Sequence, residues 1–191
     1  MASIIAIANN KGGTSKTTTC ASLAVALHEL GQKPILMVDC DPTGALSTSF
    51  GISPGQDEKT LYHALLEPAT TIKQVTRQLR PGLDLVPANR ELSAAEMILP
   101  TKTGGEQLLR KKLEAARRDY AIVLLDCPPN LGKLTVNALT AADGLVIPLT
   151  AAYLSLNPLA HLFETVEADQ TRIQVIDVIE RHRFRRLGAD R

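Results

Sequence analysis

One stretch near the start of the chain decides the fold, IIAIANNKGGTSKTT at residues 4–18. Its first part, Ile4–Ala8, is apolar throughout, as expected for a strand that is covered on both faces. Its second part is rich in glycine and hydroxyl residues and leads into a helical pattern that starts at Thr17. A glycine-rich turn between a buried strand and a helix is the context that a phosphate-binding loop requires.

Each residue type in this loop has a chemical reason to face a polyphosphate. Glycines let backbone N–H groups turn toward an anion. The helix N-terminus supplies a partial positive charge, and Lys16 supplies a full one. Thr17, directly after the lysine, is placed to ligate Mg²⁺. We therefore predict a phosphate site rather than a solvated glycine-rich turn, and its candidate residues are Lys11, Gly12, Gly13, Thr14, Ser15, Lys16, Thr17 and Thr18.

Outward from this loop, short apolar runs alternate with helical patterns. The helical patterns are Thr17–Leu30, Gly105–Arg118 and Leu131–Ala142. This alternation predicts βαβ units, and hence an α/β fold with a doubly wound, mainly parallel sheet and helices on both faces. We expect one domain over residues 1–191. The strand-like runs are Ile4–Ala8, Pro34–Asp39, Leu83–Pro87, Ala121–Asp126 and Leu145–Leu149.

The C-terminal part of the chain combines a β-branched run with an arginine-rich end. The run Ile173–Ile179 is ambiguous between strand and helix, and its β-branched residues favour a strand. Asn157-Pro158 indicates a helix start, since proline suits the first helical turn. The segment Arg172–Arg191 carries six arginines against three acidic residues, which makes it a candidate for contacts with DNA phosphates. It does not resemble a lysine-rich amphipathic helix, so we expect no membrane partner.

Two predicted strands end in acidic residues. Asp39 and Asp41 follow one apolar run, and Asp126 ends another, just before Cys127-Pro128-Pro129. Carboxyl ends of parallel strands line the ligand crevice of a doubly wound sheet. Carboxylates there can hold Mg²⁺ directly or through water, or orient a nucleophilic water. Each acid alone could equally cap a backbone group at a strand end, but together with the phosphate loop they favour a nucleotide site.

The composition of the chain bears on its partners, its metal sites and its cellular compartment. The net charge of +1 over 191 residues gives no global case for a nucleic-acid or membrane partner, so any such surface must be local. The three cysteines lie far apart, which argues against a zinc site or a disulfide framework and indicates a reducing, cytoplasmic compartment. No apolar run approaches the roughly 18–20 residues of a membrane span. The basic residues of Leu108–Lys112 and Arg117-Arg118 are interpreted as a solvated helix face.

Three motifs resemble one known family. KGGTSKTT at residues 11–18 is similar to the deviant Walker A motif of ParA, Soj and MinD ATPases, usually KGGxGKTT. VDCDP at 38–42 resembles the family's VDxDPQGN stretch, and DCPP at 126–129 resembles its Walker B segment, commonly DxPP. The similarity extends from Ile4 to about Ile179. Within this family, the chain most resembles the ParA partition ATPases.

The resemblance implies a function and roles for particular residues. The chain would be an ATPase, with slow turnover of ATP to ADP and phosphate, and ATP and Mg²⁺ as cofactors. Lys16 would hold phosphates and Lys11 would reach the partner's nucleotide across a homodimer formed on ATP binding. Asp41 is tied to hydrolysis, and Thr17, Asp41 and Asp126 would surround the metal. The dimer would bind DNA nonspecifically, and a ParB-like adaptor would stimulate hydrolysis, in partition of a plasmid, chromosome or other cargo.

Departures from the family pattern keep alternatives open. Ser15 stands where the family usually has glycine, and Thr43 and Ala45 replace its glutamine and asparagine. Family members usually continue for tens of residues past the run that matches Ile173–Ile179, so the family's C-terminal portion is expected to be missing. One alternative is a nucleotide-binding protein with little turnover. Another is a metabolic P-loop synthase of the same superfamily, such as a dethiobiotin-synthetase-like enzyme.

Overall fold

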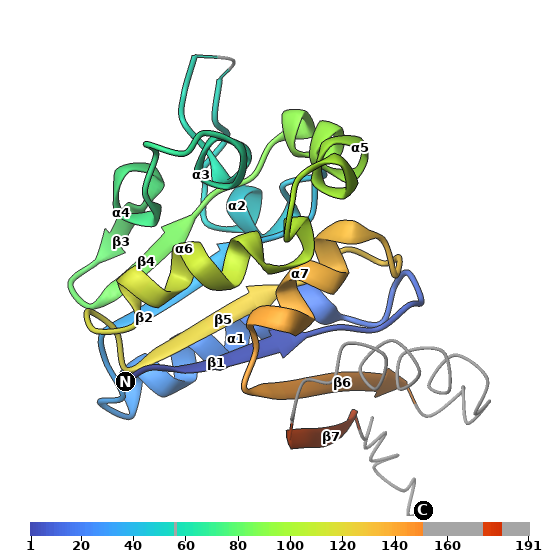
Figure 1. Cartoon of the computed structure of the whole chain (residues 1–191). Helices are drawn as coiled ribbons and strands as arrows, with labels where there is room; N and C mark the ends of the chain where they lie inside the picture. Colours follow the sequence, from blue (N-terminus) through green and yellow to red (C-terminus); the bar gives the residue numbers. More distant parts are fainter. Residues whose placement is uncertain (56, 151–173, 181–191) are drawn as a thin grey trace, which may run out of the picture.

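A seven-stranded sheet forms the centre of the computed structural model, which describes residues 1–55, 57–150 and 174–180. Helices cover both faces of the sheet (Figure 1). The strand order is β3-β4-β2-β5-β1-β6-β7, and every pair is parallel except β3 with β4. The predicted α/β fold with a mainly parallel sheet is therefore confirmed. The strands are β1 (Ser3–Ile7), β2 (Ile35–Asp39), β3 (Arg77–Arg80), β4 (Leu83–Val86), β5 (Ile122–Asp126), β6 (Gly144–Thr150) and β7 (Gln174–Glu180).

Two apolar cores lie on opposite faces of the sheet. On one face, Cys20 and Ala24 of α1 (Lys16–Glu29) and Leu46 of α2 (Ala45–Ser49) pack against the strands. The other face carries the larger core. Alternate residues of a strand point to opposite faces, so strands of the central sheet must be apolar throughout. The helices over the larger core are α3 (Leu61–Leu66), α4 (Ile72–Val75), η1 (Arg90–Ala94), α5 (Ala95–Ile98), η2 (Leu99–Thr101), η3 (Gly105–Gln107), α6 (Leu108–Ala116) and α7 (Lys133–Ala141).

The sequence analysis did not predict β3, the strand at one edge of the sheet. The strand β3 has the sequence RQLR, and two of its four residues are exposed, so no apolar run marked it. It pairs antiparallel with β4 through a turn in which Gly82 has a φ of +80°. At the other edge, β7 pairs in parallel with β6, which confirms the strand prediction for residues 174–179. The predicted helix start at Pro158 lies outside the described residues, as does most of the arginine-rich C-terminal segment.

Two basic residues of the α6 region have structural roles. Lys112 donates from Nζ to the carbonyl oxygens of Glu67, Pro68 and Thr70, at 2.7–3.1 Å. Arg117 forms an ion pair with Asp143 at 2.6 Å, and Asp143 also accepts the backbone N–H of Ile4. The interpretation of a solvated helix face is therefore wrong for these two side chains. Their contacts join the α6 region to the segment between α3 and α4 and to the turn before β6, which are far away in sequence.

Candidate functional site

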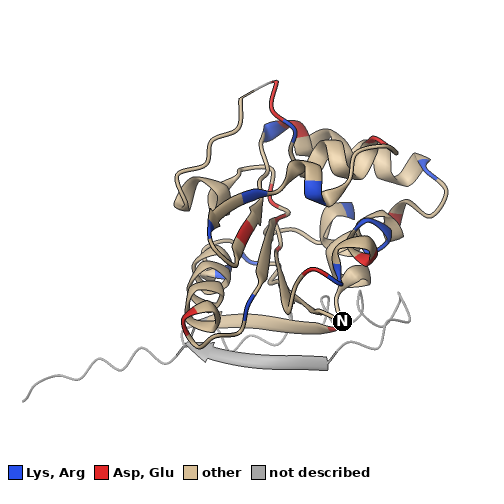
Figure 2. Ribbon diagram, turned by 90° about the vertical axis from the view of Figure 1, so that its left-hand side faces the viewer, with Lys and Arg blue, Asp and Glu red and all other residues tan. Residues whose placement is uncertain are grey.

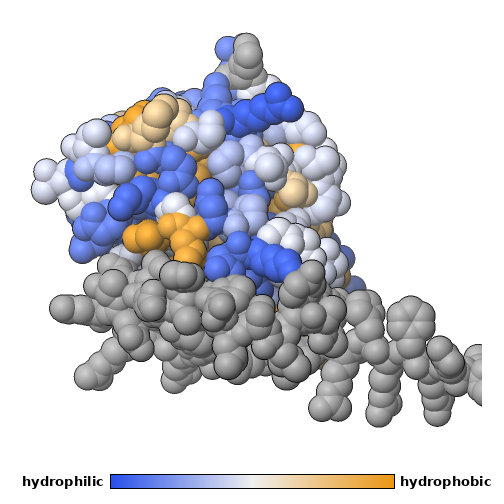
Figure 3. Space-filling model, turned by 90° about the vertical axis from the view of Figure 1, so that its right-hand side faces the viewer, coloured by the Kyte–Doolittle hydropathy of each residue, from blue (hydrophilic) through white to orange (hydrophobic). Residues whose placement is uncertain are grey.

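The order of the strands brings the predicted site residues to one edge of the sheet. β5 lies between β2 and β1, and the register places Asp126 beside both Asp39 and Ile7. The loop after β1 therefore starts next to the acidic ends of β2 and β5, at the right-hand end of β1 in Figure 1. Figure 3 shows this side of the molecule, where the described surface is mainly hydrophilic with small separate apolar areas.

Internal hydrogen bonds fold the phosphate loop onto itself. The carbonyl oxygen of Lys11 accepts from Thr14 Oγ1 and from Lys16 Nζ, both at 3.1 Å. Asn9 accepts the Lys11 N–H at 3.1 Å and donates from its buried Nδ2 to the Pro148 carbonyl at 2.8 Å. Asn9 thus fastens the loop to β6. It was not among the predicted site residues, because its partner is 139 residues away in sequence.

The tip of the loop is open and the base is covered. Gly12, Gly13 and Thr18 are exposed, whereas Thr14 and Lys16 are buried. Gly13 has a φ of +72°, a conformation that glycine adopts without strain. A Cβ added at Gly12 or Gly13 would meet nothing within 4 Å. There is consequently space on this side of the loop for a ligand to approach the backbone.

Ser15 adopts a left-handed conformation at the start of α1, with φ 59° and ψ 25°. It is the one non-glycine residue with positive φ in the described part of the chain. The serine side chain makes no capping hydrogen bond to the helix. A residue with a Cβ in this conformation costs on the order of 1–2 kcal/mol relative to its preferred conformations. The glycine of the family motif would avoid that strain.

We expect Ser15→Gly to relieve this strain. The variant should tighten ATP binding or speed its hydrolysis by no more than about tenfold, which corresponds to roughly 1.4 kcal/mol. Nucleotide titration and steady-state phosphate release on both proteins measure the effect. Weaker ATP binding by Ser15→Gly would mean that the serine hydroxyl is itself a ligand and that the strain argument is mistaken.

Asp126 is fully buried beside Lys16 and Thr17. Burial raises the pKa of Asp126 to about 7, against the opposing influence of the Thr17 hydroxyl and the Lys16 ammonium. Although Thr17 is close enough to favour the ionised form, neither carboxylate oxygen has a well-formed hydrogen bond. Burial also lowers the pKa of Lys16, and the nearby carboxylates of Asp126 and Asp41 partly offset this shift. Without a ligand, the burial of the Asp126 carboxylate and the Lys16 ammonium group destabilises the folded protein.

The two acids at the end of β2 have different surroundings. Asp39 is fully buried and accepts from Ser47 N at 2.8 Å, Ser47 Oγ at 2.7 Å and Asp41 N at 3.2 Å. Burial raises the pKa of Asp39 to about 6. Asp41 is only half-buried, and its carboxylate accepts the Thr43 N–H at 2.9 Å. Asp39 therefore shapes the turn, and Asp41 remains accessible at its surface.

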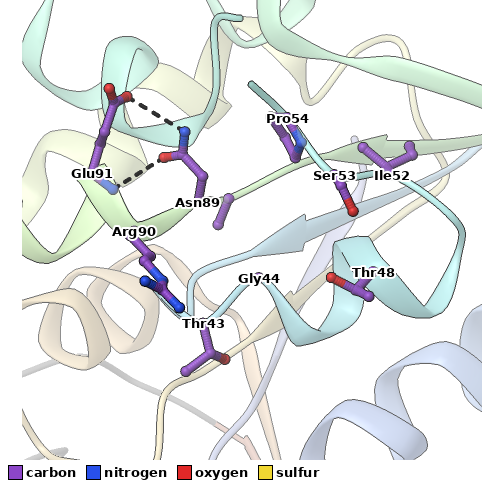
Figure 4. Close-up of a pocket in the computed structure, with 10 residues that line it drawn as sticks. Thr43, Gly44, Thr48, Ile52, Ser53, Pro54, Asn89, Arg90 and Glu91 are labelled. Carbon is purple, nitrogen blue, oxygen red and sulfur yellow. Dashed lines mark hydrogen bonds between the residues drawn. The ribbon is translucent and has the colours of Figure 1, made fainter. Parts of the chain in front are cut away.

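A pocket of about 360 Å³ opens beside this turn (Figure 4). Thr43 and Gly44 line one side of it and Asn89–Glu91 line another. The side chain of Asn89 contacts Glu91 through the two bonds drawn in the figure, at 3.2 and 3.5 Å. Thr43, which stands where the family usually has glutamine, thus lies on a polar surface next to Asp41.

The donor set suits a magnesium ion that is also bound by phosphate. In the described ranges, no three His, Cys, Asp or Glu side chains are grouped as a protein-only metal site. Mg²⁺ in nucleotide sites takes few protein ligands and keeps water and phosphate oxygens in its shell. The unpartnered oxygens of Asp126 and the nearby hydroxyl of Thr17 fit that mode of binding. The three cysteines are buried as apolar residues in the cores.

Comparison with known proteins agrees with this geometry. A family model described as an AAA domain, AAA_31, matches residues 2–177. The chromosome partitioning protein ParA of Caulobacter vibrioides is 42% identical over 86% of this chain and 62% of its own length. The sporulation initiation inhibitor protein Soj of Bacillus subtilis is 38% identical over 94% of the chain and 71% of its own length. The chain thus spans less than two thirds of the Caulobacter protein.

A solved structure has nearly the same fold. Cobyrinic acid a,c-diamide synthase from Mycobacterium smegmatis, with bound ADP and magnesium, has a TM-score of 0.87 and 34% identity. The match covers 94% of this chain and 74% of that one. The same synthase has also been solved with an ATP analogue and magnesium. In the part of the chain that the structure describes, no helix is long and apolar enough to cross a membrane.

Proposed function

Since the chain belongs to the ParA/Soj family of P-loop ATPases, we propose that it is a cytoplasmic switch that binds Mg-ATP and hydrolyses it slowly to drive partition or positioning of a cargo. The observation that carries this proposal is the buried, unpartnered carboxylate of Asp126 beside Lys16 and Thr17, at the base of an open glycine loop. Mg-ATP would supply the phosphate charges and the cation that these groups require.

Each residue of the site has a role in this proposal. The backbone of residues 12–15 and the Lys16 ammonium hold the β- and γ-phosphates, because both present donors at the start of α1. Thr17 would bind Mg²⁺, and Asp126 would support the metal from close by. Asp41 orients the attacking water, since it is the more accessible acid of its turn. Mg²⁺, when bound, neutralises charge that develops on the phosphates.

The loop after Asp126 is suited to act as a switch. Pro128 is buried, Pro129 is exposed, and the loop leads from the site into α7. A segment that contacts the γ-phosphate can be held while ATP is bound and released after hydrolysis. We propose that its ATP-bound position favours a homodimer, in which Lys11 reaches the partner's nucleotide. The dimer then binds DNA nonspecifically, and a ParB-like adaptor stimulates hydrolysis.

The expected experimental result is ATP-dependent dimerisation and DNA binding. Wild-type protein with Mg²⁺ and a nonhydrolysable ATP analogue should form dimers and bind random duplex DNA, with an affinity that falls steeply as salt rises. Lys11→Ala should bind the nucleotide but fail to dimerise. Light scattering and fluorescence anisotropy measure the two effects, and Lys73→Ala, which alters an exposed lysine on α4, is the matched control.

Three results would contradict parts of the proposal. Equal dimerisation of Lys11→Ala and wild type would exclude the role of this lysine across the interface. DNA binding that ignores the nucleotide would exclude the switch. In Figure 2 the described Lys and Arg residues are interspersed with Asp and Glu, so the arginine-rich C-terminal segment remains the proposed DNA contact. Undiminished DNA binding by a chain cut before Arg181 would rule that segment out.

The solved synthase structure favours one second candidate, a metabolic P-loop enzyme. Such an enzyme would hydrolyse ATP only when its small substrate is present, whereas a partition switch would respond to DNA and a protein adaptor. Phosphate release measured with DNA, with an adaptor and with neither distinguishes the two. The partition proposal is preferred because the Caulobacter and Bacillus relatives named above, at 42% and 38% identity, are partition and sporulation proteins.

A further inference from the structure

The N-terminus of α7 is capped by a residue from a distant element. Its N-cap is Gly132, which has no side chain to offer. Instead, the backbone N–H of Lys133 donates to Glu96 Oε2 at 2.6 Å, and that of Leu134 donates to Glu96 Oε1 at 3.2 Å. Glu96 lies on α5, close to the start of α7 (Figure 1). A carboxylate here is stabilised by both N–H groups and by the helix dipole.

Gly132 fits this contact for a steric reason. Its backbone is extended, with φ −74° and ψ −173°, which any residue can adopt. A Cβ at this position, however, would lie 2.6 and 2.7 Å from the two carboxylate oxygens of Glu96. A side chain at position 132 would therefore force the Glu96 carboxylate to move, so the observed contact, and not the backbone conformation, is what favours glycine there.

The segment 88–96, which carries Glu96, also contacts the turn at the end of β2 that contains Asp39 and Asp41. The N–H of Ala88 donates to Ser47 Oγ at 3.1 Å, and Ser47 Oγ donates to Asp39 at 2.7 Å. A Cβ at Gly44, on the Asp41 turn, would lie 2.9 Å from the Ala88 carbonyl oxygen. Residues 88–96 thus connect the turn that carries Asp41 with the loop that follows Asp126.

We propose that Glu96 is a positioning residue for ATP hydrolysis, which rests on the function proposed above. Because Glu96 holds the first turn of α7, it fixes the position of the C-terminal end of loop 127–132 relative to the turn that carries Asp41. Glu96 lies on α5, outside the loop 11–18 that is proposed to hold the phosphates, and its carboxylate is bonded to α7, so its loss should leave nucleotide binding intact. Hydrolysis depends on the relative placement of Asp41 and the loop after Asp126, and small displacements of reacting groups slow a reaction strongly.

The test compares Glu96→Ala with wild type in binding, turnover and amide exchange. We expect ATP affinity within about twofold of wild type and turnover lower by about tenfold, the pattern of a group needed after binding. Amides of residues 130–134 should exchange faster, since local opening no longer has to break the two bonds to Glu96. Glu96→Gln keeps one acceptor oxygen and should lie between the two. Glu106→Ala, at an exposed acid of η3, is the matched control.

A double-mutant cycle tests whether Glu96 acts through Gly132. Gly132→Ala alone should lower turnover, because its methyl group displaces the Glu96 carboxylate. In the Glu96→Ala background the same methyl group has no carboxylate to displace, so it should add little. Additive losses of turnover in the double variant would mean that the two residues act separately, and would overturn the proposed contact.

The outcomes separate this proposal from the function on which it rests. Wild-type protein that fails to bind Mg-ATP contradicts the proposed function. Wild type that turns over ATP while Glu96→Ala turns it over equally well contradicts only the role of Glu96. A parallel loss of affinity, turnover and thermal stability in Glu96→Ala would show a merely structural contact, which also overturns the proposal.

Discussion

Replacing Lys16 by alanine is expected to weaken Mg-ATP binding by about ten- to a hundredfold. The side chain is buried at the base of the loop, and its ammonium group bonds the Lys11 carbonyl oxygen at 3.1 Å. In the complex that ammonium group would exchange this neutral acceptor for a phosphate oxygen. A charge-assisted hydrogen bond contributes roughly 1.5–3 kcal/mol, which sets the expected range. Titration calorimetry at saturating Mg²⁺ measures the change.

Two controls make this result specific to the phosphate contact. Lys16→Arg retains the charge but replaces a compact ammonium group by a larger planar one, so it should also bind poorly in the confined loop. Lys73→Ala removes an exposed lysine on α4 and should bind like wild type. Unchanged ATP affinity in Lys16→Ala would exclude residues 11–18 as the phosphate site.

Replacing Asp126 by asparagine is expected to stabilise the nucleotide-free protein at pH 8 while impairing its use of Mg-ATP. The pKa of Asp126 is raised from 3.8 to about 7 in the folded chain. Between these values the folded state binds more protons than the unfolded state, so the free energy of unfolding decreases as pH rises. Above pH 7 the full cost of the buried charge is present. Asparagine carries no charge and avoids it.

The stabilisation should amount to about 2–4 kcal/mol at pH 8 and shrink progressively as pH falls toward 4. Urea unfolding of both proteins without nucleotide at pH 8 and pH 5 measures it. In the same variant, Mg-ATP should bind about tenfold more weakly, because the metal loses a negatively charged neighbour. Asp41→Asn, which alters a half-buried acid, should show no comparable gain in stability. Equal stability of Asp126→Asn and wild type at both pH values would contradict the burial argument.

The sequence alone was sufficient to predict the architecture, and it also indicates the candidate site. Apolar runs are local signals, and a strand covered on both faces must be apolar throughout, so β1, β2, β5 and β6 could be identified from their own residues. The loop at 11–18 could be identified because its glycines, lysines and threonines are adjacent in the chain. The parallel arrangement then required the acidic strand ends to lie at the same edge.

Only the tertiary structure determined which residues at that edge are buried and which of them have hydrogen-bond partners. Asp39 and Asp126 look alike as acidic strand ends, but Ser47 satisfies Asp39 while Asp126 has no well-formed hydrogen bond. The partners of Asn9 and Glu96 lie 139 and 37 residues away, and no local pattern encodes such pairs. Burial and the choice of hydrogen-bond partner depend on how distant segments pack. Those properties distinguish Asp39, which has internal hydrogen-bond partners, from Asp126, which is the candidate for a ligand, and periodicity and spacing do not contain them.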